Sequence, residues 1–460
     1  MAGTTRSIVA LGWPMFVGQV AVMANGVIDN VMAGQLSAQD LAAVAIGSSI
    51  YFVVFVGLMG TLQAISPVAA QHFGGGRMDE VGETWRQGRW LVLFMLVPGT
   101  VALAYPQPLL AIAGAEPGVE ARAVAYLQSI ALGLPAALWF RAFTTFNVAV
   151  SRPRVVMAIN LLGPVCKVPL NLLFMHGSDP IPALGLPGVP AMGGAGCGLA
   201  TAVVFWTSAA IGATLLRRDR FYRRFSLAGL GRPRRAALGE LVRLGLPIGA
   251  TYLIDVSAFN LVTLMVARLG TDVVGGHAIV ANVAAVSYML PLAVAGAAGV
   301  LAGQALGAGD APGARRIAWH GVRLAAALGV AVALALVLLR APLVSAYTAD
   351  PGVGAIALAL LPWVAAYHVV DAIQVAFAFA LRAWKVAVAP MAIFAVSLWG
   401  LGLGGGAALA FGLGLGARGF WIAAVAALAC ASVALAVLFR RTARAGPAGH
   451  PADSGRVATR

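Results

Sequence analysis

The chain has 460 residues, of which 60% are hydrophobic and only 10% are charged. A soluble protein of this length would carry about 25% charged residues, so the composition excludes a soluble globular protein and predicts an integral membrane protein. The net charge of +15 is also typical of nucleic-acid-binding proteins, but basic residues at the ends of membrane spans account for it better. The chain has no GxxxxGK[ST] loop, which excludes an ATP-driven pump built on this chain alone.

Apolar windows of 20 or more residues predict an all-α protein with twelve transmembrane helices. Each window is long enough to cross about 30 Å of hydrocarbon at about 1.5 Å per residue. In chain order the windows are 8–33, 42–71, 90–113, 123–150, 155–175, 193–216, 241–268, 275–306, 318–339, 353–381, 386–411 and 417–439. Pro14 and Pro247 fall near the starts of the first and seventh windows, where we expect ordinary first-turn prolines.

The connecting loops alternate in basic content, and this pattern predicts the orientation. Most arginines and lysines fall in the two terminal segments and in alternate loops, whereas the opposite loops hold only Arg122, Arg268, Arg340 and Arg418. The positive-inside rule assigns the basic-rich side to the cytoplasm. Both termini are therefore expected there. The basic run from Arg217 to Arg243 is interpreted as a topology anchor and linker that contacts anionic lipid, not nucleic acid.

The chain matches itself at an offset of 233 residues. Residues 11–14 (LGWP) align with 244–247 (LGLP), and 71–76 (QHFGGG) with 304–309 (QALGAG). Each half then holds six spans, so both halves enter the membrane in the same sense and are related by a pseudo-twofold axis along the membrane normal. This repeat predicts an N-terminal six-helix lobe (1–216), a basic cytoplasmic linker (217–240), a C-terminal six-helix lobe (241–440) and a disordered tail (441–460).

Three aspartates lie inside these apolar windows: Asp29, Asp255 and Asp371. An acid at the bilayer centre costs about 2.5 to 3.5 kcal/mol on insertion scales, so such residues usually line an ion or substrate path. Tyr367 and Asp371 are four residues apart and Gln374 follows three later, which places their oxygens on one helical face. We therefore expect a site that accepts Na⁺ at Asp255, Asp371 and Tyr367, or a proton in its place.

The alternative for each acid is a structural ion pair. Arg141 in the fourth window and Lys167 in the fifth are the only basic residues expected at depth, and either is able to neutralise a carboxylate. Sequence spacing alone leaves this alternative open.

Several segments together resemble the multidrug and toxic compound extrusion (MATE) family in its bacterial branch. These are 27–34 (VIDNVMAG), 193–202 (GGAGCGLATA), 254–256 (IDV), 276–279 (GHAI), 289–291 (MLP) and 367–382. The resemblance implies a bacterial inner-membrane antiporter that exports organic, often cationic, compounds in exchange for Na⁺ or H⁺, with no other cofactor. Two departures are Asp255, where similar proteins typically have glutamate, and Thr144-Thr145, where an acid often occurs.

The resemblance also implies the residues of the sites. It groups Asn171 and Thr201 with Asp29 in the first lobe, as a second part of the cation-coupling set. Residue type and place in the spans suggest Gln374, Arg141, His277, Met32 and Phe259 for a substrate cleft. Methionine and aromatic side chains suit promiscuous surfaces, although in a membrane protein residues of this kind are more often core or lipid-facing. The expected partners are small organic cations and membrane lipid, and the chain is expected to be monomeric.

Three other functions fit the sequence less well. A flippase for lipid-linked precursors shares the duplicated plan, but it would line its cleft with several arginines to hold phosphate, and only Arg141 is a plausible candidate in the sequence. An intramembrane enzyme would need a nucleophile with its base or a metal cluster, and the sequence contains no such constellation. A passive channel is disfavoured by the two-lobe repeat. An exporter of cations is the favoured prediction.

Overall fold

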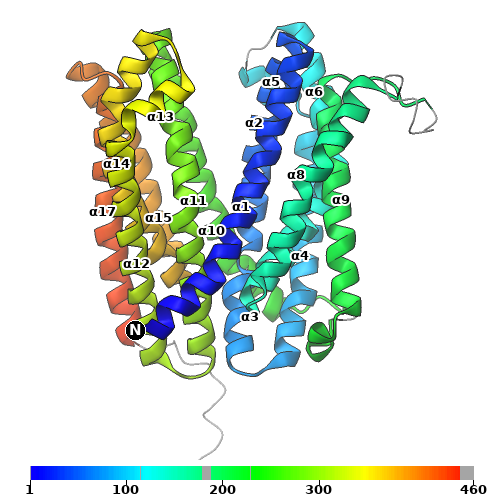
Figure 1. The fold of residues 1–460 in the computed structure, drawn as a ribbon. Helices are drawn as coiled ribbons and strands as arrows, with labels where there is room; N and C mark the ends of the chain where they lie inside the picture. Colours follow the sequence, from blue (N-terminus) through cyan, green and yellow to red (C-terminus); the bar gives the residue numbers. More distant parts are fainter. Residues whose placement is uncertain (1, 114–115, 179–187, 228, 446–460) are drawn as a thin grey trace, which may run out of the picture.

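The computed structural model describes residues 2–113, 116–178, 188–227 and 229–445, and this part of the chain is helical throughout (Figure 1). Its first half comprises α1 (Ala2–Leu36), α2 (Ala38–Leu62), α3 (Ile65–Gly74), α4 (Met78–Ala104), α5 (Gln107–Ala113), α6 (Pro117–Ala131), α7 (Leu134–Ala149), α8 (Pro153–His176) and α9 (Gly194–Arg218).

The second half follows the short 3₁₀ helix η2 (Arg220–Phe225). It comprises α10 (Arg235–Val266), η3 (Ala267–Leu269), α11 (Thr271–Gly307), α12 (Ala311–Leu338), α13 (Arg340–Tyr347), α14 (Pro351–Ala383), α15 (Val388–Phe394), the π-helical η4 (Ala395–Gly404), α16 (Gly405–Ala407), the π-helical η5 (Ala408–Gly412) and α17 (Ala417–Ala445). α10 begins at Arg235 and α17 extends to Ala445, and residues 446–460 of the predicted tail lie outside the described part.

The prediction of twelve spans in an all-α membrane protein is confirmed. Within the described residues, 11 helices are long and apolar enough to cross a membrane, and the bent pair α6 and α7, which meet at 52°, brings the number to 12. The predicted third span is too long, because α4 ends at Ala104. Pro106 explains this end, since a proline disfavours helix at the residue before it and cannot donate a backbone hydrogen bond.

Prolines also explain where other spans differ from expectation. The second span breaks between Leu62 and Ile65, because the ring of Pro67 would clash with the carbonyl of the residue four positions earlier. The prediction that Pro14 and Pro247 are first-turn prolines is wrong, since both lie inside their helices. Each comes twelve residues after its helix begins, from 2 to 14 and from 235 to 247.

The internal repeat extends to the helix boundaries. Helices α1, α2 and α4 begin at residues 2, 38 and 78, and α10, α11 and α12 begin 233 residues later, at 235, 271 and 311. Figure 1 shows α2 to α9 in one group and α10 to α17 in the other, with α1 running from the base of the second group toward the first. The groups meet through repeat-related pairs, since α1 packs on α11 and α10 packs on α2.

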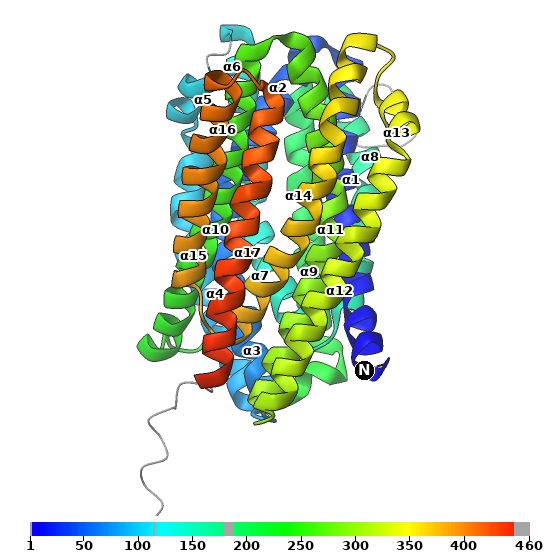
Figure 2. The ribbon, with the colours of Figure 1, turned by 90° about the vertical axis from the view of Figure 1, so that its left-hand side faces the viewer.

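Figure 1 shows the two groups diverging at one end and approaching at the other, which we call the base. Figure 2 shows that α1 begins and α17 ends at the base. At the base the repeats cross at Gln71 to Gly74 and Gln304 to Gly307, which we call the base crossing. A Cβ on Gly74 would lie 1.9 Å from the Gln304 carbonyl oxygen, and one on Gly307 would lie 1.8 Å from that of Gln71. Only glycine permits this approach.

Each glutamine of the base crossing also donates a hydrogen bond to the other group. Gln71 Nε2 donates to the carbonyl of Ala383, the last residue of α14, at 2.8 Å. Gln304 Nε2 donates to the carbonyl of Ala149, the last residue of α7, at 2.8 Å. Terminal helix carbonyls have no partner within their own helix, so each glutamine satisfies an otherwise unpaired group across the interface.

Residues of the predicted linker pack against the first half of the protein. Tyr222 in η2 donates a 2.6 Å hydrogen bond to Asn147 of α7, and Trp90 of α4 donates to the Gly231 carbonyl at 3.2 Å. Asp219 accepts from the Phe221 backbone N–H and pairs with Arg152 at 2.5 Å. These two contacts, the backbone N–H first, hold the pKa of Asp219 below its ordinary value. These linker residues therefore form their hydrogen bonds and ion pair within the protein.

Candidate functional site

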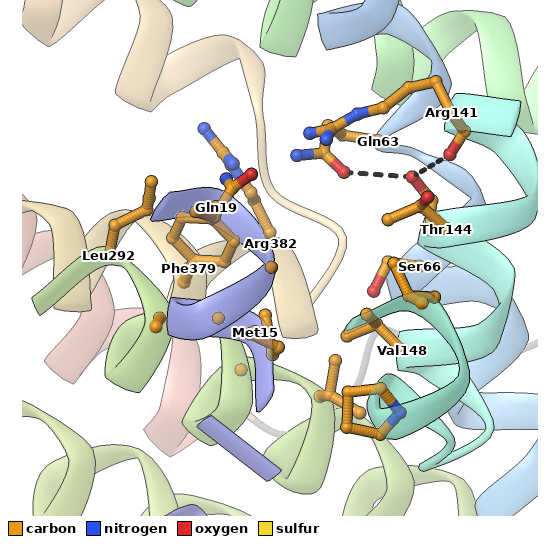
Figure 3. Close-up of a pocket in the computed structure, with 18 of the residues that line it drawn as sticks. Met15, Gln19, Gln63, Ser66, Arg141, Thr144, Val148, Leu292, Phe379 and Arg382 are labelled. Carbon is orange, nitrogen blue, oxygen red and sulfur yellow. Dashed lines mark hydrogen bonds between the residues drawn. The ribbon is translucent and has the colours of Figure 1, made fainter. Parts of the chain in front are cut away.

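A cavity of about 150 Å³ lies between the two groups of helices (Figure 3). Its walls come from both repeats: Met15 and Gln19 of α1, Gln63 at the break after α2, Arg141 and Thr144 of α7, Leu292 of α11, and Phe379 and Arg382 of α14. The break in the second span allows the Gln63 side chain to reach this cavity, which we call the inter-lobe cavity.

The charged side chains of this cavity are Arg141 and Arg382. No carboxylate is among the described residues that line it. Arg382 donates to the Tyr252 hydroxyl at 3.2 Å, and its guanidinium lies 4.5 Å from the centre of the Phe379 ring. The Nε of Arg141 is buried and has no hydrogen-bond partner. Figure 3 shows both guanidinium groups directed into the cavity from opposite sides.

A second, smaller cavity of about 30 Å³ lies within the second half, and we call it the acid cavity. Asp255 of α10 and Asp371 of α14 line it, together with Thr251, Tyr288 and Gln374. Tyr252, Phe379 and Arg382 line both cavities, so the acid cavity adjoins the inter-lobe cavity. A volume of this size holds one or two water molecules or a desolvated cation.

Asp255 and Asp371 have no hydrogen bond or ion pair within the described part of the chain. Asp371 is 8% exposed, Gln374 is 3% exposed, and Asp255 is exposed. Carboxylate, amide and hydroxyl oxygens are the ligands that hard cations prefer, so the donor set fits Na⁺. Two carboxylates so close together also favour a shared proton. The structure places these two predicted acids and Gln374 in one cavity, and their role in coupling stays a prediction.

Tyr367 does not line the acid cavity. Its ring packs on Trp421, with centroids 5.5 Å apart. The described residues contain no group of three or more His, Cys, Asp or Glu side chains suited to a metal ion. A cation bound between the two acids would take its further ligands from Thr251, Tyr288 and Gln374 instead.

Asp29 has a different environment. Lys167 Nζ lies 3.0 Å from its Oδ2, and Asn171 Nδ2 donates to its Oδ1 at 2.8 Å. Lys167 also donates to the Thr201 hydroxyl and to the Cys197 carbonyl. The structure thus groups Asp29, Asn171 and Thr201 as the family resemblance implied, and it adds Lys167. For this acid, the ion-pair alternative matches the geometry.

The other predicted cleft residues lie away from both cavities. His277 is buried between Phe259 and Trp421, with ring centroids 6.1 and 5.7 Å away. The Met32 sulfur lies 3.5 Å from Asn171 Nδ2 and belongs to the surroundings of Asp29. Of the predicted cleft set, Arg141 lines the inter-lobe cavity and Gln374 lines the acid cavity.

The sequence reasoning missed Arg382, Tyr252, Tyr288 and Thr251. Arg382 follows the last residue of a predicted span, so it counted as a residue of the membrane edge. Two signals in the sequence pointed to it: Arg152 lies 230 residues earlier, close to the offset of the repeat, and Arg382 ends the segment 367–382 of the family resemblance. The hydroxyl residues carry no charge within apolar windows, so composition and hydropathy give no indication of them.

A comparison with family models matches MatE to residues 14–173 and 247–408. The two matched units begin 233 residues apart, the offset of the internal repeat. The chain belongs to the MATE family. Membership of this family of transporters confirms the predictions that the chain is not an enzyme and that it needs no cofactor apart from its coupling ion.

Relatives of similar length support this assignment. The chain is 40% identical over 434 residues to a probable multidrug resistance protein NorM of Aromatoleum aromaticum, covering 93% of this chain and 92% of that protein. It is 34% identical over 447 residues to the multidrug resistance protein PmpM of Pseudomonas aeruginosa, covering 95% and 92%.

Solved structures show the same fold. The eukaryotic MATE transporter AtDTX14 superposes with a TM-score of 0.86 at 17% identity, covering 97% of this chain and 98% of that one. A MATE protein in a bent conformation gives a TM-score of 0.86 at 18% identity, covering 96% of each chain. These likenesses confirm the all-helical membrane architecture of the MATE transporters.

Proposed function

We propose that this MATE chain is a multidrug efflux antiporter that exports organic, often cationic, compounds in exchange for Na⁺ or H⁺. The observation that carries the proposal is the unpaired acid pair, Asp255 and Asp371, in a cavity that adjoins the cavity between the lobes. The relatives named as multidrug resistance proteins support the substrate class.

The exchange follows from competition for charge. An incoming cation or proton neutralises the acid cavity, and the cationic end of a drug is attracted to the same carboxylates when they are free. Both cannot be bound at once, so loading the ion displaces the drug. One net elementary charge moving down 100 mV releases about 2.3 kcal/mol, so each coupling ion beyond the charge of the exported drug supports roughly fiftyfold accumulation.

Alternating access places the movement at the repeat interface. The pairs of α1 with α11 and α10 with α2 form the contact between the lobes, and the base crossing closes one end. Rocking about these contacts would open the base and close the opposite end, which is the usual movement of two repeats around a fixed site. We propose that the base faces the cytoplasm of a bacterial cell, with both termini there, that the membrane is the inner one, and that one chain suffices.

Within this mechanism we assign different roles to the two sets of acids. Asp255 and Asp371, with Gln374, Thr251 and Tyr288, bind the coupling ion. Asp29 forms a neutral pair with Lys167 that holds α1, α8 and α9 together, and Asn171 and Thr201 complete its hydrogen bonds.

Everted membrane vesicles test the proposal. A fluorescent organic cation is added outside, and either a Na⁺ gradient or a pH gradient is imposed, each with the higher concentration of the coupling ion inside the vesicles. Uptake into the vesicles driven by one of the gradients is the expected result, and the responding gradient identifies the ion. No uptake under either gradient, with the protein present in the membrane, would contradict the proposal.

A flippase for lipid-linked precursors is the second candidate, and one observation favours it. The inter-lobe cavity holds two arginines, Arg141 and Arg382, where the sequence had suggested one. A flippase would translocate a phosphate-bearing lipid and leave small cations behind, so the same vesicles distinguish the two functions.

A further inference from the structure

Arg382 lies where the acid cavity meets the inter-lobe cavity. It lines the acid cavity together with Asp255 and Asp371, and it lines the inter-lobe cavity as well. Among the described residues around the inter-lobe cavity, only Tyr252, Phe379 and Arg382 also line the acid cavity. These three side chains therefore form the boundary between the two cavities.

Contacts within the second half hold the guanidinium of Arg382 at this boundary. Its Nη1 donates to the Tyr252 hydroxyl at 3.2 Å, and its central carbon lies 5.2 Å from the centre of the Tyr252 ring and 4.5 Å from that of the Phe379 ring. Figure 3 shows Arg382 beside Phe379 on the wall of the inter-lobe cavity. A guanidinium stays charged at any physiological pH and is attracted to aromatic faces. The boundary thus carries a permanent positive charge, and no ion pair within the described residues includes it.

The acids lie on one side of this boundary and the base crossing on the other. From 371 to 382, Asp371 precedes Arg382 by eleven residues of α14, which is about 16 Å along the helix. Ala383, the next residue, accepts the hydrogen bond from Gln71 of the base crossing. An ion that moves through these cavities from the acids toward the base therefore passes Arg382.

The charges along this route have opposite effects on a cation. The carboxylates of Asp255 and Asp371 attract it, whereas a fixed guanidinium repels it, and the repulsion is strong where little water screens the charges. Pores of membrane proteins use an arginine in this way to exclude cations. Asp255 is exposed and Arg382 is half-buried, so an ion is able to reach the acids at Asp255 before it meets Arg382.

We propose that Arg382, positioned by Tyr252 and Phe379, is an electrostatic gate that prevents the coupling ion from leaking from the acid cavity toward the base while the base is closed. This inference rests on the proposed antiport function and adds the residue that ties ion movement to drug movement. The ion then passes toward the base only when the lobes rock and the boundary between the cavities rearranges.

Ion flux in the absence of any drug tests the gate. The purified protein is reconstituted into liposomes, and a Na⁺ gradient and a pH gradient are imposed in turn, with entry followed by radioactive Na⁺ or by a pH-sensitive dye inside. Arg382→Gln removes the positive charge and is expected to raise the drug-free flux of the coupling ion about tenfold. Tyr252→Phe removes the hydroxyl that holds Arg382 and should raise the flux less, about threefold.

Matched variants separate a lost gate from a damaged protein. Arg382→Lys keeps the charge, so its drug-free flux should stay close to that of the wild type. Arg315→Gln removes an exposed arginine of α12 that lines neither cavity, and no leak is expected. Adding Asp371→Asn to Arg382→Gln should abolish the leak, because the leaking ion has to bind the acids, whereas a leak through a misfolded protein would persist.

Three results would overturn the inference. The first is a drug-free flux of Arg382→Gln equal to that of the wild type, which would assign the arginine to structure or lobe movement. The second is an equal leak from Arg382→Gln and Arg382→Lys, and the third is a leak that survives the addition of Asp371→Asn. In each case the proposed function stands as long as the wild-type protein exports an organic cation under an ion gradient. If it exports none under either gradient, the proposed function itself fails.

Discussion

The two halves of this protein share one scaffold but place their membrane-embedded acids in opposite electrostatic environments. In the first half, Asp29 has Lys167 at 3.0 Å and an amide donor at 2.8 Å. In the second half, Asp255 and Asp371 have no partner within the described residues and line a cavity together. The two halves therefore share their helices, whereas the acid of the first is neutralised and the acids of the second are unpaired.

The internal repeat relates this difference to individual positions in the two halves. At an offset of 233, Asp255 corresponds to Val22 and Asp29 to Val262, so neither acid has an acidic counterpart. At the offset of 230 that aligns Arg152 with Arg382, Lys167 corresponds to Ser397 within η4. Arg382 also lines the acid cavity, but within the described residues it forms no ion pair with Asp255 or Asp371, so these two acids remain unpaired.

The largest effect is expected from Asp371→Asn. This change keeps the shape of the side chain and removes half of the charge that binds the coupling ion. Gradient-driven export of a fluorescent cation should fall at least about a hundredfold, since hydrogen-bonded charge contacts of this kind contribute about 1.5 to 3 kcal/mol each and the ion also loses its Coulomb attraction. Transport at the wild-type rate, at equal protein level, would remove Asp371 from the coupling site.

Unlike the acids, the two glycines of the base crossing have the same environment in both halves, so substituting either one should have the same effect on export. Gly74→Ala and Gly307→Ala each place a methyl group within 2 Å of a carbonyl of the other lobe. Each is expected to prevent closure of the base and to slow export about tenfold or more, because overpacking costs about 1 to 3 kcal/mol or more. Export rates measured side by side check this prediction.

Gly26→Ala supplies the matched control for the base crossing. Gly26 is also helical, but a Cβ at that position would meet no atom within 4 Å, so its export rate should remain that of the wild type. A large loss in only one of the two base variants would contradict the symmetric role assigned to them.

Breaking the ion pair of Asp29 and Lys167 should lower the stability of the protein against thermal unfolding. Asp29→Asn leaves Lys167, which is 1% exposed, without its counter-charge, and removing one partner of a buried pair costs about 3 to 5 kcal/mol. The double variant Asp29→Asn with Lys167→Met removes both charges and should recover most of this loss. Thermal unfolding in detergent measures it. A double variant no more stable than the single one would show that the two residues do not act as a pair.

The smallest effects concern the neutral ligands. Tyr288→Phe and Gln374→Leu each remove one oxygen from the acid cavity and should weaken the apparent affinity for the ion about three- to tenfold. Tyr367→Phe, outside that cavity, should change it less than about twofold. The ion concentration that gives half-maximal export is the measurement. A larger loss of apparent affinity in Tyr367→Phe than in Tyr288→Phe or Gln374→Leu would indicate that Tyr367 contributes to the ion site after all.

Much of this fold was predictable because hydropathy, basic loops and the repeat all report on membrane crossing. Pro67 and Pro106 also indicate where the second and third spans break, although hydropathy averaged over a window of residues does not show these breaks. The site was less accessible. Helical spacing relates Asp371 to Gln374, but no spacing relates either residue to Asp255 or Tyr288 on other helices. The resemblance grouped Asn171 with Asp29, whereas the choice of Lys167 over Arg141 as partner needed distances.

The central claim is that the unpaired acids of the second lobe couple the ion and that the neutral pair of the first lobe does not. Its most direct test is ion-driven export by two double variants in the same vesicles: Asp255→Asn with Asp371→Asn, and Asp29→Asn with Lys167→Met. The account predicts that the first loses all response to the imposed gradient while the second keeps it. Retained coupling in the first, or lost coupling in a well-folded second, would contradict the account.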